Sequence, residues 1–292
     1  MKPVQLALPW ARVARIAIEA AAWAALLLLA WDLPGDMRDA GAYYDLRLDD
    51  IYAHHTFLDT GYVYSPAFAV VTEPLRWLPP EVMDGVIRTA STVALGWLVT
   101  PYVGTALILV EYPGLRAELG IGNIDLLVTA VLVFILWKPW LWPTLLLTKV
   151  APGVGLAWHL ARREWRALGI AIGLTAGIAV LSLPFVGIGA WLEWWDALTG
   201  ENIAIANEAT AIPLGIRLAA GFVLAALAGL AGWAWFIPIA VAISFADPNV
   251  AHWLVIFAIP RLYLATRRHR SGSSDASPDQ PARPAGGALN AT

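Results

Sequence analysis

Long apolar runs recur along this sequence of 292 residues, and they constrain its fold more than any other feature. The first run, from Val13 to about Leu33, is close to the ~20 apolar residues that one helical membrane crossing requires. Apolar residues make up 59% of the chain and charged residues only 14%, whereas soluble domains have about half and about a quarter. The sequence therefore predicts an all-α membrane protein, a polytopic bundle of transmembrane helices.

Clusters of basic residues orient this bundle, because cytoplasmic loops carry an excess of Lys and Arg. They lie around the start of the first run, in the middle of the chain and after the last run: Lys2, Arg12 and Arg15; Arg162, Arg163 and Arg166; Arg267, Arg268 and Arg270. Both termini are therefore expected in the cytoplasm, with a long first outer loop at about 34–80 and a second at about 187–211. A cleavable signal peptide is the alternative for the first run, but the run is long for one.

Two apolar stretches are irregular, and each fits either a straight passage through the membrane or a hairpin. Residues 82–115 are long for one crossing and short for two, and Pro101 lies near their middle. Residues 124–160 are interrupted by Lys149 and Pro152, among others. Eight spans result if both stretches pass straight through the membrane, and ten membrane helices result if each folds as a hairpin.

The charge balance and the absence of cysteine exclude several classes of protein. Lys plus Arg number 19 and Asp plus Glu 22, and this net charge of −3 gives no basis for binding nucleic acid. Without cysteine there are no disulfides, thiolate metal sites or cysteine nucleophiles. One transmembrane domain is expected over residues 1–270. Residues 271–292, which have little bulk to bury, are expected to form a disordered cytoplasmic tail.

Ionisable side chains at membrane depth are costly and usually face protein or water, so Lys149, Arg217 and His252 are candidate functional residues. Each has a structural alternative: a lysine can snorkel from a helix end, an arginine can anchor at the interface, and a histidine can be buried in a core. The first outer loop gathers acids, histidines and tyrosines: Asp36, Asp39, Asp45, Asp49, Asp50, His54, His55, Asp59, Tyr43, Tyr44, Tyr52, Tyr62 and Tyr64. Acids outside, cations at the membrane and rings between them would suit a lipid-linked substrate with a phosphate head.

Six short motifs occur in the order found in one known family. They are the first outer loop with Asp39-Ala-Gly-Ala-Tyr43, Gly61 to Phe68 and Pro74 to Pro79; Gly122-Asn123-Ile-Asp125; Lys149-Val-Ala-Pro152; Arg162 to Arg166; Asn207-Glu208-Ala-Thr210 with Arg217 downstream; and Asp247 to Trp253. In these motifs the chain resembles glycosyltransferase family 87, whose members are integral membrane sugar transferases of the GT-C superfamily. The resemblance implies a GT-C-like bundle, here of 8–10 membrane helices.

The resemblance also implies the reaction. A sugar, most often mannose, would pass from a polyprenyl phosphate donor to a glycolipid or glycan acceptor on the outer side of the cell membrane. Asp39 would act as the general base on the acceptor hydroxyl, with inversion at the anomeric carbon and with Asp36 and Asp45 as reserve candidates.

Further roles follow from the same resemblance. Lys149, Arg217 and His252 would bind the donor phosphate. The residues expected to bind the rest of the substrates are Tyr43, Tyr64, Asn123 and Asn207. No metal or other cofactor is required by this scheme, although Asp36 and Asp39 with His54 or His55 could hold a metal.

The motifs depart from the family pattern at two acids. Glu208 replaces an expected amide, and Asp125 stands where the family element ends in a neutral residue. Two other functions remain open: a transporter, whose ionisable groups would converge near the bilayer midplane, and a noncatalytic relative that acts as a membrane scaffold.

Overall fold

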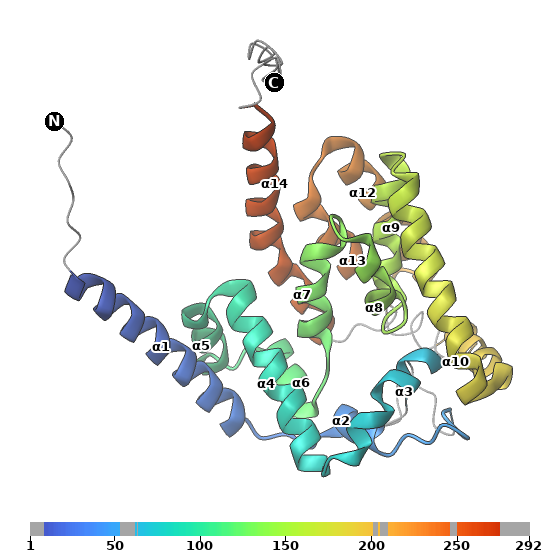
Figure 1. Ribbon diagram of the computed structural model, residues 1–292, viewed down its shortest axis with the longest axis horizontal. Coiled ribbons are helices and arrows are strands. Elements are labelled where there is room, and N and C mark those ends of the chain that lie inside the picture. Colours follow the sequence, from blue (N-terminus) through green and yellow to red (C-terminus); the bar gives the residue numbers. More distant parts are fainter. Residues whose placement is uncertain are drawn as a thin grey trace, which may run out of the picture.

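The computed structural model describes residues 9–52, 62, 64–200, 204, 210–245 and 250–274. Helices account for most of these residues, and no strand occurs among them (Figure 1). The expected all-α class is therefore confirmed. The α-helices are α1 (Pro9–Asp32), α2 (Arg38–Tyr44), α3 (Pro66–Thr72), α4 (Pro80–Val99), α5 (Pro101–Leu109), α6 (Pro113–Ile121), α7 (Asp125–Ile135), α8 (Trp142–Leu146), α9 (Leu156–Ala161), α10 (Trp165–Thr199), α12 (Leu214–Ala231), α13 (Ile237–Ala242) and α14 (Ile259–Ser274).

Short 3-10 helices join several of these elements. They are η1 (Glu73–Trp77), η2 (Pro139–Leu141), η3 (Ala151–Gly155), η4 (Ala234–Phe236) and η5 (Val250–Ala258). Proline occupies the first or second position of η1, η2 and η3, where its missing N–H costs nothing because no intrahelical acceptor is available there.

Four of the described helices are long and apolar enough to cross a membrane: α1, α4, α10 and α12. A fifth span results if α6 and α7 are counted together, although they meet at an angle of 106°. The other apolar stretches expected as spans are divided into short helices. For example, residues 139–161 form η2, α8, η3 and α9 in succession. The prolines of this stretch account for the division, since proline in a helix interior removes a backbone hydrogen bond and clashes with the preceding turn.

The first irregular stretch folds back on itself. Thr100 adopts a positive φ of 86° between α4 and α5, and Pro101 begins the second helix. Helix α5 then packs against both α1 and α4. This arrangement resembles the hairpin alternative for residues 82–115.

The expected second outer loop begins as a helix. Helix α10 runs through Thr199 and bends at Gly187, whose φ of 71° is readily adopted only by glycine. Its second arm carries Trp191, Trp194 and Trp195, which the sequence analysis placed in a loop.

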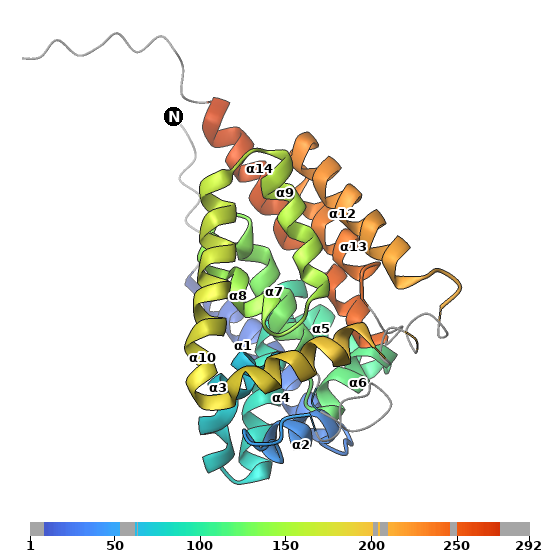
Figure 2. The ribbon, with the colours of Figure 1, turned by 90° about the vertical axis from the view of Figure 1, so that its right-hand side faces the viewer.

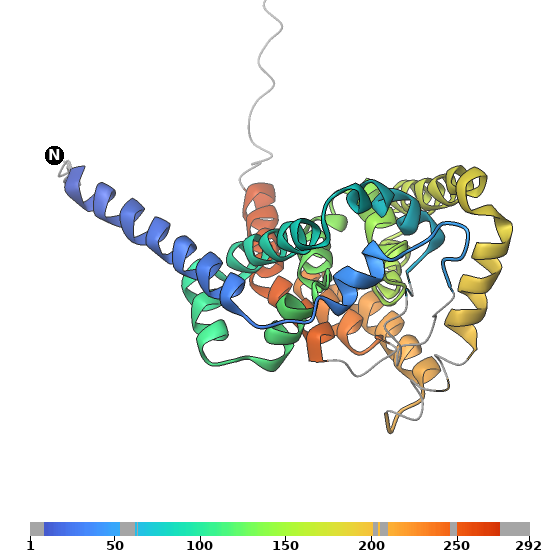
Figure 3. The same cartoon turned by 90° about the horizontal axis from the view of Figure 1, so that it is seen from below.

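The bundle has two distinct ends. Helix α9, the start of α10 and the end of α14 lie at one end, whereas α2, α3 and the start of α4 lie at the other (Figure 2). Helix α1 projects away from the rest of the molecule (Figure 3). Its Leu26 and Ala30 are buried against the bundle, while Trp10, Val13 and Ile16 are exposed, as expected for a helix that contacts lipid.

A close approach between α2 and the turn joining α6 to α7 sets the position of the candidate site. Gly122 forms this turn with a φ of 73°, and a Cβ at this position would lie 2.6 Å from the Cβ of Ala40. Only glycine satisfies both the backbone conformation and the lack of space. The turn thereby brings Asn123 and Asp125, which follow it, next to the helix that carries Asp39.

Candidate active site

A buried ion pair lies at the centre of the candidate site. Asp125 is the first residue of α7, and Lys149 follows α8. Lys149 Nζ lies 2.5 Å from Asp125 Oδ1, and the two side chains are only 12% and 4% exposed. An isolated buried charge is costly, so the charge of each group is stabilised by the other.

His252 of η5 joins this pair. Its Nε2 atom lies 3.2 Å from Lys149 Nζ and 3.5 Å from Asp125 Oδ2, and its ring is stacked on Phe245 at a centroid distance of 4.3 Å. Protonated Nε2 would donate to Asp125, whereas unprotonated Nε2 would accept from Lys149. The structure thus brings together two of the expected phosphate-binding residues, which are 103 positions apart in the sequence.

Glu118 is a site residue that the sequence analysis missed. Its side chain is fully buried, and Oε1 accepts a hydrogen bond of 2.7 Å from the backbone N–H of Leu126 in the first turn of α7. Its Oε2 atom has no hydrogen-bond partner among the described residues. The only sequence signal was an acid a few residues before a helix start, where carboxylates are favourable.

Three of the expected substrate-binding residues form a chain beside the ion pair. Tyr43 and Tyr64 share a hydrogen bond of 2.8 Å between their hydroxyls, and the Tyr64 hydroxyl lies 3.5 Å from Asn123 Oδ1. Asn123 Nδ2 donates to Asp125 Oδ2 at 3.4 Å. Both tyrosines are buried and their rings pack against Phe68. Their hydroxyls therefore hydrogen-bond within the cluster, while their ring faces are covered by other side chains.

Asp39 approaches the cluster from α2. Its side chain is 24% exposed and forms an ion pair of 3.4 Å with Arg38. Burial raises the pKa of the Asp39 carboxyl above its ordinary value, while the charges of Lys149 and Arg38 oppose this rise. Asp39 and Lys149 therefore lie within electrostatic reach of each other.

Arg217 stands apart from this cluster. Its guanidinium donates to the backbone carbonyls of Ile212 at 3.1 Å and Phe245 at 2.5 Å, so it is connected to His252 through the residue on which that ring stacks. Among the reserve acids, Asp36 accepts from the N–H of Arg38, and Asp45 follows α2 directly.

Several expected residues lie outside the part of the chain that the structure describes: His54, His55, Asn207, Glu208 and Asp247. Within the described part, no group of three or more His, Cys, Asp or Glu side chains is placed to hold a metal ion.

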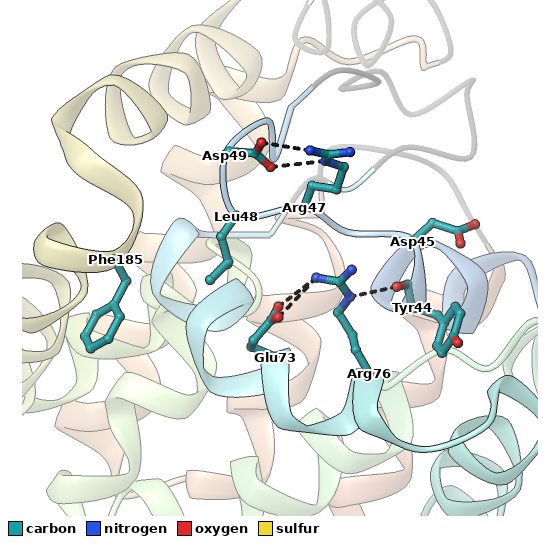
Figure 4. Close-up of a pocket in the computed structure, with 8 residues that line it drawn as sticks. All are labelled: Tyr44, Asp45, Arg47, Leu48, Asp49, Glu73, Arg76 and Phe185. Atoms are coloured by element: carbon teal, nitrogen blue, oxygen red, sulfur yellow. Dashed lines mark hydrogen bonds and ion pairs between the residues drawn. The ribbon is translucent and has the colours of Figure 1, made fainter.

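A cavity of about 700 Å³ opens beside the C-terminal end of α2 (Figure 4). Its lining residues are Tyr44, Asp45, Arg47, Leu48, Asp49, Glu73, Arg76 and Phe185. The cavity is thus distinct from the cluster of Asp39, Lys149 and His252.

Comparison with known proteins identifies the family. The model of glycosyltransferase family 87 matches residues 62–274, a range that includes Asn123, Lys149 and His252, whereas Asp39 precedes it. No curated protein and no solved structure matched the chain. Because the match covers most of the sequence, the chain belongs to glycosyltransferase family 87.

Proposed function

We propose that this membrane glycosyltransferase moves one sugar from a polyprenyl phosphate to a glycolipid or glycan acceptor, and that this sugar is mannose. The observation that carries the proposal is the contact between Lys149 and His252, in which Lys149 lies within electrostatic reach of Asp39. A lysine and an imidazole thus lie near a partly buried carboxylate, and transfer from a lipid phosphate requires both a phosphate-binding group and a base.

Asp39 is the proposed base. Its raised pKa makes its carboxylate a stronger proton acceptor than an exposed one. The acceptor hydroxyl gives its proton to Asp39 while its oxygen forms a bond to the anomeric carbon. The bond from that carbon to the phosphate oxygen breaks on the opposite face, and its electron pair leaves with the polyprenyl phosphate. Attack opposite the leaving group inverts the anomeric configuration.

Lys149 and His252 are the proposed ligands of the donor phosphate, with Arg217 supporting them through Phe245. Asp125 contacts both residues. Asp125 is therefore an anion with which the donor phosphate competes for Lys149 and His252.

The two ends of the bundle support the proposed orientation. Helices α2 and α3 lie at one end of the bundle. The last turns of α14 and the first turn of α10, where the basic cluster of Arg162, Arg163 and Arg166 is found, lie at the opposite end (Figure 2). With the basic residues in the cytoplasm, both termini are cytoplasmic, and Asp39 faces the outer side of the cell membrane. The polyprenyl chain holds the donor in the lipid bilayer, from which the donor reaches the site on the outer side.

The test is to incubate the purified protein in lipid nanodiscs with polyprenyl phosphate mannose and a membrane lipid extract. Mass spectrometry should detect a new glycolipid heavier by one hexose, together with an equal amount of released polyprenyl phosphate. Omission of the lipid extract should abolish the product. If the protein instead carries a solute across the membrane and releases no polyprenyl phosphate, the proposal is wrong and the transporter alternative is supported.

A further inference from the structure

We propose that the cavity beside α2 binds the neutral oligosaccharide portion of the acceptor. This inference rests on the proposed function, because it assigns the acceptor class. The cavity has a volume of about 700 Å³, which lies within the range of small-molecule sites. Its walls come from four parts of the chain: the end of α2, the turn that follows it, η1 and the bend of α10 (Figure 4).

Hydrogen bonds within the cavity order its polar groups, most firmly the half-buried pair of Arg76 and Glu73. Arg76 Nη1 donates to both carboxylate oxygens of Glu73, at 3.2 and 2.9 Å, and Arg76 Nε donates to the Tyr44 carbonyl at 2.9 Å. Arg47 makes two hydrogen bonds to Asp49, at 3.1 and 2.9 Å. Side chains that are already ordered lose less conformational entropy on binding, which favours a ligand that makes many weak contacts.

The charge of the cavity favours a neutral ligand over a phosphate. Arg47 and Arg76 each pair with a carboxylate, and Asp45 adds a further negative charge to the lining. A phosphate would have to displace these carboxylates. Sugar hydroxyls, in contrast, can donate to the remaining carboxylate lone pairs and accept from the remaining guanidinium N–H groups.

An aromatic ring complements these polar groups. Phe185 is 64% exposed and lies on the α10 side of the cavity, across from Arg76 (Figure 4). The face of a phenyl ring can pack against the C–H groups of a sugar, which gives the cavity one apolar and one polar wall.

The position of the cavity fits an acceptor chain. Tyr44 ends the helix in which Asp39 is the second residue. Five residues at 1.5 Å of rise place the cavity about 7.5 Å from the proposed base along the helix axis. An oligosaccharide whose terminal hydroxyl reaches Asp39 can therefore extend its preceding sugars into the cavity, away from the cations proposed for the donor.

The experiment measures saccharide binding without requiring turnover. Saturation-transfer NMR is recorded on the full chain in nanodiscs with mannotriose, maltotriose and cellotriose, each tested separately. At least one trisaccharide should bind. Phe185→Ala and Asp45→Ala should each weaken its binding about two- to tenfold, the range for the loss of one modest contact. Phe222→Ala, which removes an exposed aromatic ring of α12, is the matched control and should have no effect.

Two results would overturn the inference: none of the trisaccharides binds, or binding survives both cavity substitutions. Competition by inorganic phosphate at millimolar concentration would also contradict it. The acceptor KM separates this inference from the proposed function. If sugar transfer proceeds and the cavity variants keep the parent KM, only the cavity assignment fails. If the cavity binds saccharide but no polyprenyl phosphate is released from the donor, the proposed function fails.

Discussion

Replacing Asp125 by Asn should make the protein bind polyprenyl phosphate more tightly. In the structure the Asp125 carboxylate lies 2.5 Å from Lys149 Nζ and 3.5 Å from His252 Nε2, the groups proposed to hold the donor phosphate. The amide keeps the shape of the side chain but removes its charge. Lys149 is then left without its closest anion, and the phosphate can supply one.

The magnitude follows from the burial of the pair. A charge-assisted hydrogen bond is worth about 1.5–3 kcal/mol, so Asp125→Asn should tighten binding roughly ten- to hundredfold. Without donor, loss of one partner of a buried pair costs about 3–5 kcal/mol of stability. The variant should therefore unfold at a lower temperature than the parent. Addition of polyprenyl phosphate should raise the Tm of the variant by more than it raises the Tm of the parent.

The assay measures the Kd of polyprenyl phosphate and the Tm with and without this ligand, in one detergent. Asp84→Asn is the matched control, since Asp84 belongs to another buried pair, 3.2 Å from Arg88. That variant should lose stability but gain no affinity. If Asp125→Asn binds polyprenyl phosphate as weakly as the parent or more weakly, the competition between Asp125 and the phosphate is refuted.

Four further substitutions test other parts of the account. Arg38→Gln removes a charge that lowers the pKa of Asp39, so this pKa should rise further. The acid limb of the kcat/KM profile should then move to higher pH. A limb that stays in place would contradict the assignment of Asp39. Gly122→Ala forces an alanine to a φ of 73° against α2 and should cost at least about 1 kcal/mol of stability; an unchanged Tm would show that α2 is free to shift. His252→Ala should weaken polyprenyl phosphate binding about ten- to hundredfold, and Arg217→Ala, which acts through Phe245, should weaken it less. Loss of acceptor affinity alone would move both residues to the acceptor subsite.

The helical class was predictable from the sequence, and so was the choice of Lys149 and His252 as candidate residues. Apolar runs of membrane length leave few alternatives to helices. Ionisable residues at membrane depth are rare enough to be noticed singly, which is why Lys149 and His252 were identified before their proximity was known. Asp39 was identified through the motif that surrounds it.

Other features were not predictable, for physical reasons. Residues 188–199 looked like an outer loop because Gly187 and several tryptophans are typical of a membrane boundary, yet the chain resumes its helix after the bend. Glu118 looked like an ordinary acid near a turn, and Asp125 was noticed only as a departure from the family motif. Their importance depends on the burial produced when α6 and α7 meet α2 and η5, and a pattern along one chain does not record such contacts.

The most direct test of the central claim compares turnover and donor binding in Asp39→Asn. Turnover should fall by about 10²–10⁴-fold, the usual contribution of a general base, while the Kd of polyprenyl phosphate stays at the parent value. Asp50→Asn, an exposed acid of the same loop, should behave like the parent in both measurements. A residual rate near half that of the parent would contradict the account and direct attention to Asp36 and Asp45.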